Sequence, residues 1–231
     1  MPPATPTTEQ ISQWLREHVK KKRPGRFARW FGEPEHFTYD VGRPVEVPVR
    51  FLIRHRLFSV DGEDGLLPLP ALPDGSWGIF AADGDTLQLL EPETGSLSSL
   101  LARENRPLDQ GDPADVARLF SLVLVTGREP PHHEIVASAD EIRQFRWGLM
   151  EGYQADDTAL RSVEHMIVPP AIGESPTGGW VLTFTTVAGW MHELYELGVE
   201  TFEISGQFTV VRHPRQIFHP RIFQKVPAIW Y

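Results

Sequence analysis

Histidines next to carboxylates are the side chains in this sequence best suited to acid–base or metal chemistry. His132-His133-Glu134 follows two prolines, and we expect it in a loop, where neighbouring side chains point to opposite sides and two imidazoles rarely bind one ion. His192-Glu193 begins the pattern of a zinc-protease helix, but Glu196 stands where the second histidine belongs. We therefore expect no bound metal and no cofactor. The residues that become catalytic candidates if the fold brings them together are His132, His133, Glu134, His192 and Glu193.

Other patterns that could carry chemistry are incomplete. The carboxylates within residues 61–65 could give oxygens to calcium, but the EF-hand spacing is missing and a solvated turn explains the run. Gly75-Ser76-Trp77-Gly78 is one residue short of the nucleophile elbow, and no phosphate-binding glycine loop is present. The chain has no cysteine, which excludes disulfides and thiolate chemistry. These observations favour a protein that is not an enzyme.

The most unusual stretch of the sequence, residues 16–31, combines basic and aromatic side chains. This composition is suited to stacking on single-stranded nucleic acid, to docking on an acidic protein, or to an anionic membrane surface. It is equally typical of a helix whose aromatic residues lie in the core and whose lysines are solvated. The partner-binding residues that we predict in this stretch are Lys20, Lys21, Lys22, Arg23, Arg26, Phe27, Arg29 and Trp30.

Charge is unevenly distributed along the chain, whose formal net charge is -9. Residues 44–203 carry 26 acidic and 10 basic side chains, whereas residues 204–231 carry four basic side chains and no acidic one. Residues 1–43 are also net basic. The acidic middle disfavours extensive nucleic-acid binding, which needs a positive surface. The basic ends could make a local anionic contact, or they could pair with the acidic middle of their own fold.

The last fifteen residues of the chain, Ile217 to Tyr231, are rich in large apolar side chains. Leaving apolar surface in water is unfavourable by about 25 cal/mol per Å². The segment is therefore expected either to dock on the fold or to form a surface for a partner. We assign Trp230 and Tyr231 to partner binding.

Apolar residues spaced three and four apart predict helices near residues 7–23, 97–101, 113–126 and 139–151. Each of the three longer helices has a recognisable first turn, in which a side-chain oxygen can accept from an orphaned backbone N–H. The expected caps are Thr7 with Gln10, Asp112, and Ser138 with Glu141.

Alternation of apolar and polar residues predicts strands at residues 45–53, 77–81, 86–90, 162–168, 180–187, 199–204 and 207–212. Pro48 cannot donate to a ladder, so the first strand should lie at a sheet edge. Asp83-Gly84 should join the second and third strands as a hairpin, which makes residues 44–92 a β-meander. Residues 171–179 form a Gly/Pro loop, and residues 190–197 fit a strand or a helical turn equally well.

These elements predict an α+β fold of antiparallel β-meanders with segregated helices: an N-terminal helix, central helices and a C-terminal sheet. We expect a single domain, 1–231, with a sub-boundary near 105–112 that would separate the helix and meander of 1–106 from the helices and meander of 112–231. No apolar run is long enough to span a membrane, and the N-terminus does not resemble a secretory signal. The expected location is the cytoplasm.

The leading functional hypothesis is a protein-binding module, such as an inhibitor or immunity protein, an adaptor or an assembly subunit. Its acidic central body and its basic, aromatic ends would recruit another protein, and charge complementarity would select that partner. A homo-oligomer is also compatible with the sequence. The alternatives are a hydrolase-like enzyme with a dispersed His/Glu site and a nucleic-acid-associated protein that uses residues 16–31.

Overall fold

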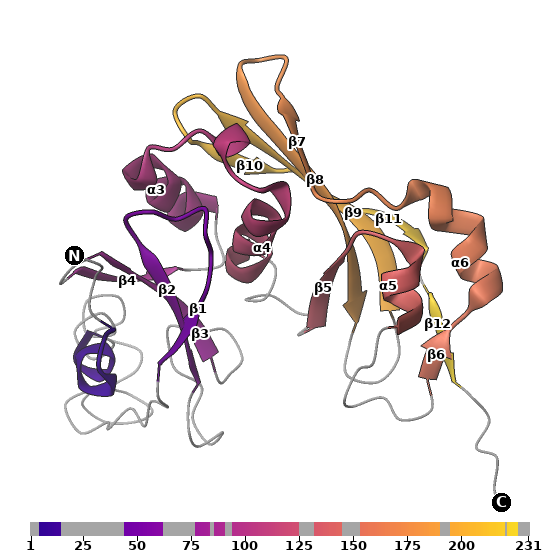
Figure 1. Cartoon of the computed structure of the whole chain (residues 1–231), viewed down its shortest axis with the longest axis horizontal. Helices are drawn as coiled ribbons and strands as arrows, with labels where there is room; N and C mark the ends of the chain where they lie inside the picture. Colours follow the sequence, from indigo (N-terminus) through magenta and orange to yellow (C-terminus); the bar gives the residue numbers. More distant parts are fainter. Residues whose placement is uncertain are drawn as a thin grey trace, which may run out of the picture. The chain divides into compact units, whose positions relative to one another are not determined.

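A computed structural model describes residues 5–14, 44–61, 77–83, 86–90, 94–124, 132–144, 153–189, 195–219 and 221–225. The chain divides into two compact units, Met1–Glu91 and Pro92–Tyr231. Helices and antiparallel sheets alternate along the chain, which confirms the predicted α+β class (Figure 1). The division between the units falls earlier in the chain than residues 105–112. Among the described helices, none has the length and apolarity required to cross a membrane.

In the first unit, residues 8–14 are helical and begin at the predicted capping box. The Gln10 backbone N–H donates to Thr7 Oγ1 at 3.1 Å, and the Thr7 N–H donates to Gln10 Oε1 at 2.8 Å. Ile11 is fully buried, and the Trp14 ring meets the Phe80 ring edge to face at 5.5 Å. The predicted continuation of this helix to residue 23 lies outside the described residues.

The first unit also holds the predicted β-meander, a four-stranded antiparallel sheet in the order β1-β2-β3-β4. Its third and fourth strands pair through Asp83 and Thr86, which confirms the predicted hairpin. The bounds of the four strands are β1 (Val45–Val47), β2 (Arg56–Asp61), β3 (Trp77–Asp83) and β4 (Thr86–Leu90).

The predicted strand at 45–53 was wrong in its length. β1 ends at Val47, directly before Pro48, and the Leu52 N–H then donates to the Val49 carbonyl across a turn. The turn buries Phe51 and turns Ile53 outward, where it is 72% exposed. Because Pro48 cannot donate a hydrogen bond to the neighbouring strand, the strand does not continue past it, although the apolar–polar alternation does. The predicted position of this strand at a sheet edge is confirmed.

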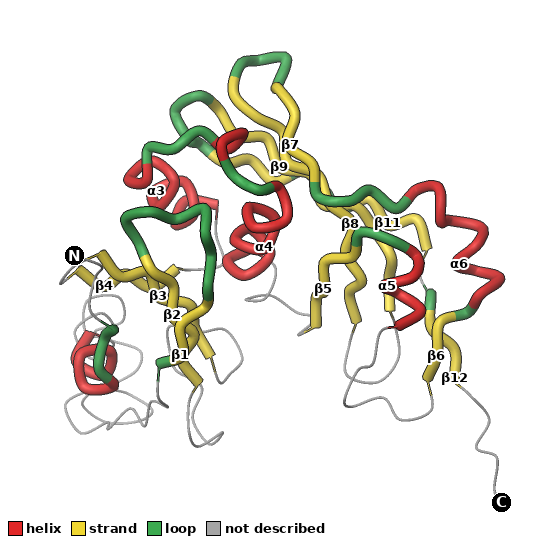
Figure 2. Tube along the Cα trace, viewed as in Figure 1, coloured by secondary structure: helices red, strands yellow, loops and turns green. Residues whose placement is uncertain are grey.

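The second unit is built around a long antiparallel hairpin of β8 (Gly179–Gly189) and β9 (Tyr195–Ser205). Each outer side of the hairpin pairs with two shorter strands placed one after the other, so the sheet is four strands wide at both ends (Figure 2). β7 (Ala171–Glu174) and β5 (His132–Val136) pair with β8. β10 (Val210–Arg212) and β11 (Gln216–His219) pair with β9.

Helices cover opposite faces of this sheet at its two ends (Figure 1). At the Gly179 end, α3 (Thr94–Glu104), the short helix η2 (Leu108–Gln110) and α4 (Pro113–Leu124) lie on one face, and the Phe120 ring of α4 contacts the Phe202 ring of β9 at 5.1 Å. At the other end, α5 (Ala139–Gln144) and α6 (Asp157–Val163) pack on the opposite face over Val187 and Leu197. The short helix η3 (Glu164–Met166) follows α6, and β6 (Tyr153–Ala155) pairs with β12 (Phe223–Lys225).

The predicted helix caps of the second unit are confirmed. Asp112 Oδ1 accepts from the Ala114 N–H at 2.9 Å at the start of α4. Ser138 Oγ accepts from the Glu141 N–H at 3.2 Å, and the Glu141 carboxylate in return accepts from the Ala137 N–H at 2.8 Å. Capping succeeds as a predictor because its signal lies within four residues of sequence.

Three local predictions in the second unit were wrong, the third of them in part. Residues 162–168, predicted as a strand, belong mainly to α6 and η3, because Asp156 Oδ1 accepts from the Thr158 and Ala159 N–H groups and starts a helix. His132-His133-Glu134, predicted in a loop, belongs to strand β5. Within the loop predicted at 171–179, the first four residues form β7. Tyr195–Leu197 belongs to β9, which settles that part of 190–197 as strand.

Part of the apolar C-terminal segment docks on the fold, as one of the two interpretations predicted. Ile222 is fully buried in the core under α5 and α6, and Phe218 and Phe223 pack against the same core. Ile217 remains 48% exposed. Trp230 and Tyr231 lie outside the described residues, so their assignment to partner binding stays a prediction.

The turn between β9 and β10 holds a bulky residue in the left-handed region, Phe208, at φ 62°. Its ring is nearly buried and stacks on Trp180 at 5.7 Å. We expect both Phe208→Ala and Phe208→Gly to lower the free energy of unfolding, with alanine the more destabilising by about 1 kcal/mol, because glycine adopts positive φ without strain. Denaturant titration of the two variants measures the difference. An alanine variant more stable than the glycine variant would contradict the strain.

Candidate binding site

Most of the sequence-predicted site residues fall outside the described parts of the chain. These are the basic and aromatic residues from Lys20 to Trp30, His192, Glu193, Trp230 and Tyr231. His132, His133 and Glu134 are consecutive residues of β5, and Glu134 is exposed. The structure therefore does not test whether His192 or Glu193 approaches the other three. Within the described ranges, no three His, Asp or Glu side chains gather closely enough to hold a metal ion.

The sheet of the second unit presents an exposed area at the Gly179 end, on the face opposite α3 and α4. Paired residues of neighbouring antiparallel strands point to the same face, so the register fixes which side chains share it. The first row across the sheet is Gly173, Val181, Glu203 and Val211. The second row is Ala171, Thr183, Thr201 and His213. None of the eight is buried, and we call them the open face.

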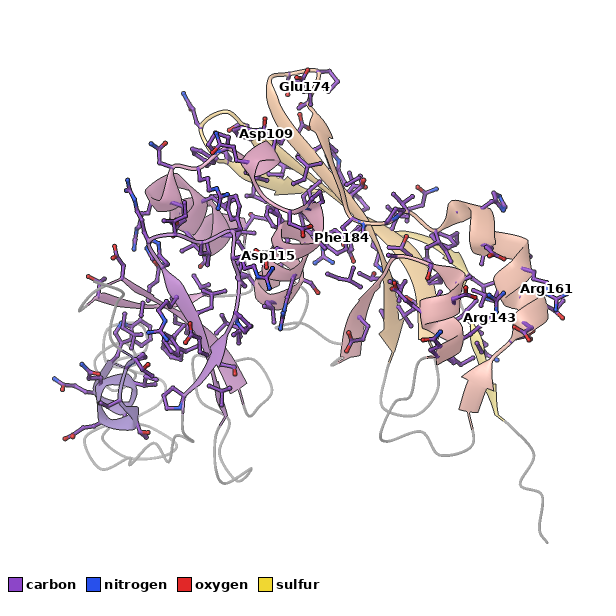
Figure 3. The ribbon with its side chains drawn as sticks, viewed as in Figure 1. Asp109, Asp115, Arg143, Arg161, Glu174 and Phe184 are labelled. Atoms are coloured by element: carbon purple, nitrogen blue, oxygen red, sulfur yellow. The ribbon has the colours of Figure 1, made fainter. Side chains whose placement is uncertain are left out.

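The open face ends where the layer of α5 and α6 begins. In the next row, Thr185 is fully buried: its N–H donates to the Val168 carbonyl at 3.0 Å, and its hydroxyl oxygen accepts from the Val168 N–H at 2.7 Å. At the other end, Glu174 marks the tip of β7, while Phe184 lies beside α4 on the covered face (Figure 3). The open face is thus a shallow surface four strands wide and two rows deep.

Glu203 is held in one orientation by two hydroxyl groups from the β7–β8 turn. Ser175 Oγ and Thr177 Oγ1 each donate to Glu203 Oε1 at 2.6 Å. The turn itself is closed by the Ser175 N–H, which donates to the Gly179 carbonyl, and by the Gly178 N–H, which donates to the Ser175 carbonyl. Because the hydroxyls come from a closed turn, the carboxylate is fixed before any ligand arrives.

The hydroxyl contacts decide the chemistry available to Glu203. Hydrogen bonds from Ser175 and then Thr177 lower the pKa of Glu203 from its ordinary value, with a smaller contribution from His213. The carboxylate is therefore ionised throughout the neutral range. A base with a lowered pKa abstracts protons poorly, so this arrangement is better suited to binding a cation than to activating Ser175 as a nucleophile.

The second carboxylate oxygen of Glu203 faces His213. His213 Nε2 lies 3.7 Å from Oε2, too far for a good hydrogen bond, and the two form an ion pair only when the imidazole is protonated. The Glu203 side chain is 32% exposed. Sequence analysis missed this site, because Ser175 and Glu203 are 28 residues apart and only the strand register brings them together.

A second cluster of charged residues lies on the opposite face of β9, around the fully buried Glu200. Arg212 makes three hydrogen bonds of 3.0–3.2 Å with the Glu200 carboxylate and donates to the Leu124 carbonyl at the end of α4 at 3.3 Å. Arg215 Nε lies 3.4 Å from Glu200 Oε1, and Arg215 Nη1 lies 3.0 Å from Glu196 Oε2. For Arg212 and Arg215, pairing of the basic C-terminal segment with the acidic middle of the chain is confirmed.

The guanidinium of Arg215 reaches its position because β9 has no side chain beneath it. A Cβ on Gly198 would lie 3.1 Å from Arg215 Cζ and 2.8 Å from the Gln216 carbonyl oxygen. Arg215 also donates to Thr186 Oγ1, to the Thr186 carbonyl and to the Glu196 carbonyl at 2.9–3.1 Å. Burial lowers the pKa of Arg215, while Glu200 and Glu196 oppose that shift. With its charges balanced internally, this cluster ties β10, β11 and α4 to β9.

A third charged cluster joins α5 to α6 at the surface. Arg143 pairs with Asp140 at 2.6 Å and with Asp157 at 3.1 Å, and Glu164 lies 3.8 Å away. Figure 3 shows Arg143 and Arg161 on these two helices. The hydrogen bond that Arg143 donates to Asp140, followed by the one it donates to Asp157, raises the pKa of Arg143. Exposed pairs of this kind contribute little individually, so we read the cluster as a link between helices.

The cluster at Glu203 combines a fixed charge with the exposed sheet surface of the open face around it. Comparison of the chain with protein-family models, curated proteins and solved structures finds no match, so the site stands on its own geometry.

Proposed function

We propose that the protein is a protein-binding module and that the open face is the centre of its binding surface. The observation that carries the proposal is the composition of this face: eight residues, none of them buried, with Glu203 as the single carboxylate and His213 as the single imidazole. The other six are glycine, alanine, valine and threonine. Val211, on the edge strand β10, is 52% exposed.

The composition distinguishes this surface from an ordinary solvated sheet face. An antiparallel sheet can face water on one side, but that side then usually alternates polar and charged residues with the buried set. Protein interfaces are instead depleted of charged residues at their centre. A standard interface involves about 20–30 residues a side, so the open face would supply the centre and its surroundings the rim.

The sequence assigns further residues to the same function. The basic and aromatic residues of the 16–31 stretch, with Trp230 and Tyr231, stay predicted contacts for the partner. Arg212 and Arg215 are already engaged with glutamates of their own fold, so we leave them out of the proposed surface. A cytoplasmic location, expected from the sequence, is part of the same proposal.

Site-specific photocrosslinking tests this function. A photoreactive phenylalanine analogue replaces Val211, on the open face, or Ile217, which is similarly exposed but paired with Gly198 and so lies on the opposite face. In lysate of the source cells, we expect a discrete crosslinked protein from position 211 and none from position 217. No product at 211, or the same products at both positions, would contradict the proposal. A product of twice the chain mass would identify a second copy as partner and contradict a heterologous one.

A further inference from the structure

We infer that Glu203 is the residue of the open face that determines specificity, and that it binds the ammonium group of a lysine side chain carried by the partner. The existence of a protein partner rests on the proposed function. The choice of a lysine rests on the geometry of Glu203 and its neighbours.

Glu203 presents a fixed negative charge. Ser175 and Thr177 hold Oε1, and both hydroxyls come from one closed turn. The hydroxyl bonds also keep the carboxylate ionised, because they favour its charged form. Binding of a cation here therefore requires no deprotonation of the carboxylate and no loss of conformational entropy to order it.

The hydroxyl groups occupy one carboxylate oxygen only, which leaves Oε2, with His213 Nε2 3.7 Å away, as the oxygen that can accept from a ligand. A carboxylate oxygen accepts two strong hydrogen bonds, and those of Oε1 are taken by Ser175 and Thr177 at 2.6 Å each. A guanidinium binds a carboxylate best through two parallel bonds, one to each oxygen. An ammonium group is a compact charge that needs only one oxygen. The occupied Oε1 therefore favours lysine over arginine.

Apolar side chains lie beside the charge on the open face. In its row, Glu203 is flanked by Val181 on β8 and Val211 on β10. A lysine stem of four methylene groups can lie over such a side chain while its charged end reaches an anion. Val211 is 52% exposed, so it offers that contact without any rearrangement.

A peptide titration tests the inference independently of any natural partner. The probe is the extended peptide acetyl-Val-Thr-Lys-Thr-Val-amide, in which alternation puts the lysine and both valines on one side. Matched peptides carry arginine or norleucine in place of the lysine. Backbone amide shifts of the full-length protein are followed by NMR at low ionic strength.

We expect saturable shifts at Thr201, Glu203 and Val211 with the lysine peptide, with a dissociation constant on the order of millimolar. Binding should be about threefold weaker for the arginine peptide and about fivefold weaker for the norleucine peptide, the range of an exposed ion pair. No saturable shift up to about 10 mM, or equal affinity for the norleucine peptide, would overturn the inference.

Two variants identify the group responsible. Glu203→Gln keeps an acceptor oxygen for Ser175 and Thr177 but removes the charge, and it should abolish the preference for lysine over norleucine. Thr177→Val, at an exposed position, removes one hydroxyl from Oε1 and should bring arginine close to lysine in affinity. A lysine preference that survives Glu203→Gln, or an unchanged lysine-to-arginine ratio in Thr177→Val, would refute the assignment. Neither result would change the crosslinking expected at Val211. The lysine assignment can therefore fail while the proposed protein-binding function stands.

Discussion

Replacing Glu200 by glutamine is expected to lower the free energy of unfolding of the second unit by about 3–5 kcal/mol, because it removes the buried carboxylate that pairs with both Arg212 and Arg215. Glu200 is fully buried and receives three hydrogen bonds from Arg212, while Arg215 lies against its other side. Chemical denaturation, combined with hydrogen exchange of the β9 amides, measures the loss in this unit.

Glu196→Gln is the matched control for that prediction. Glu196 is on the same strand and pairs with the same Arg215, but its side chain is 34% exposed. Water can replace the lost pair there, so the expected cost is at most about 1 kcal/mol. If the two variants were equally stable, burial of Glu200 would not control the energetics of this cluster, and Arg215 would have to be stabilised mainly by the Thr186 and Glu196 carbonyls.

Glu200→Gln is also a control for the peptide-binding experiments on the open face. Glu200 and Glu203 lie on the same strand but on opposite faces, since residues three apart in a strand point to opposite sides. Glu200→Gln should therefore loosen β10 without touching the open face directly. A fall in peptide binding in that variant would report loss of strand pairing, whereas a fall in Glu203→Gln with unchanged stability reports loss of the charge.

The parts of the fold that could be predicted from the sequence are those with local signals. The caps at Thr7, Asp112 and Ser138 are each completed within four residues, and all three were predicted. The hairpin at Asp83 likewise depends on a turn pair between two short alternating runs. In each case neighbouring residues carry the whole physical cause, so no knowledge of tertiary structure is needed.

The candidate site could not be predicted, because the contacts that Glu203 makes with Ser175, Thr177 and His213 are not local. The alternation of 199–204 predicted a strand that contains Glu203, but not which residues would lie across from it. Ser175, in the turn, and His213, beyond β10, meet Glu203 only after β7, β8, β9 and β10 have paired in one register. Non-local pairing also explains β5: its local sequence predicts a loop, but hydrogen bonding to β8 makes it a strand.

The turn that holds Ser175 and Thr177 depends on Gly179, and Gly179→Ala is expected to destabilise the second unit by about 3 kcal/mol or more. Gly179 has φ 107°, where any side chain is strained. A Cβ there would overlap the Ile204 carbonyl oxygen and lie 2.8 Å from the Ser205 carbonyl carbon. Both contacts are with backbone of the paired strand β9, which cannot move aside without breaking the ladder. Thermal and chemical denaturation measure the loss.

Substitutions at two nearby glycines distinguish the cost of positive φ from the cost of the steric overlap at Gly179. Gly178 has φ 85° but open space around its Cβ position, so Gly178→Ala should cost about 1 kcal/mol from strain alone. Gly206, in the turn after β9, has open space and no positive φ, so Gly206→Ala should change stability by less than about 0.5 kcal/mol. If Gly179→Ala cost no more than Gly178→Ala, the close approach of β8 to β9 at Ile204 would be relieved by a small shift of the strands. The hydrogen bonds from the Ser175 and Thr177 hydroxyls to Glu203 would then tolerate more movement of the turn than their 2.6 Å lengths suggest.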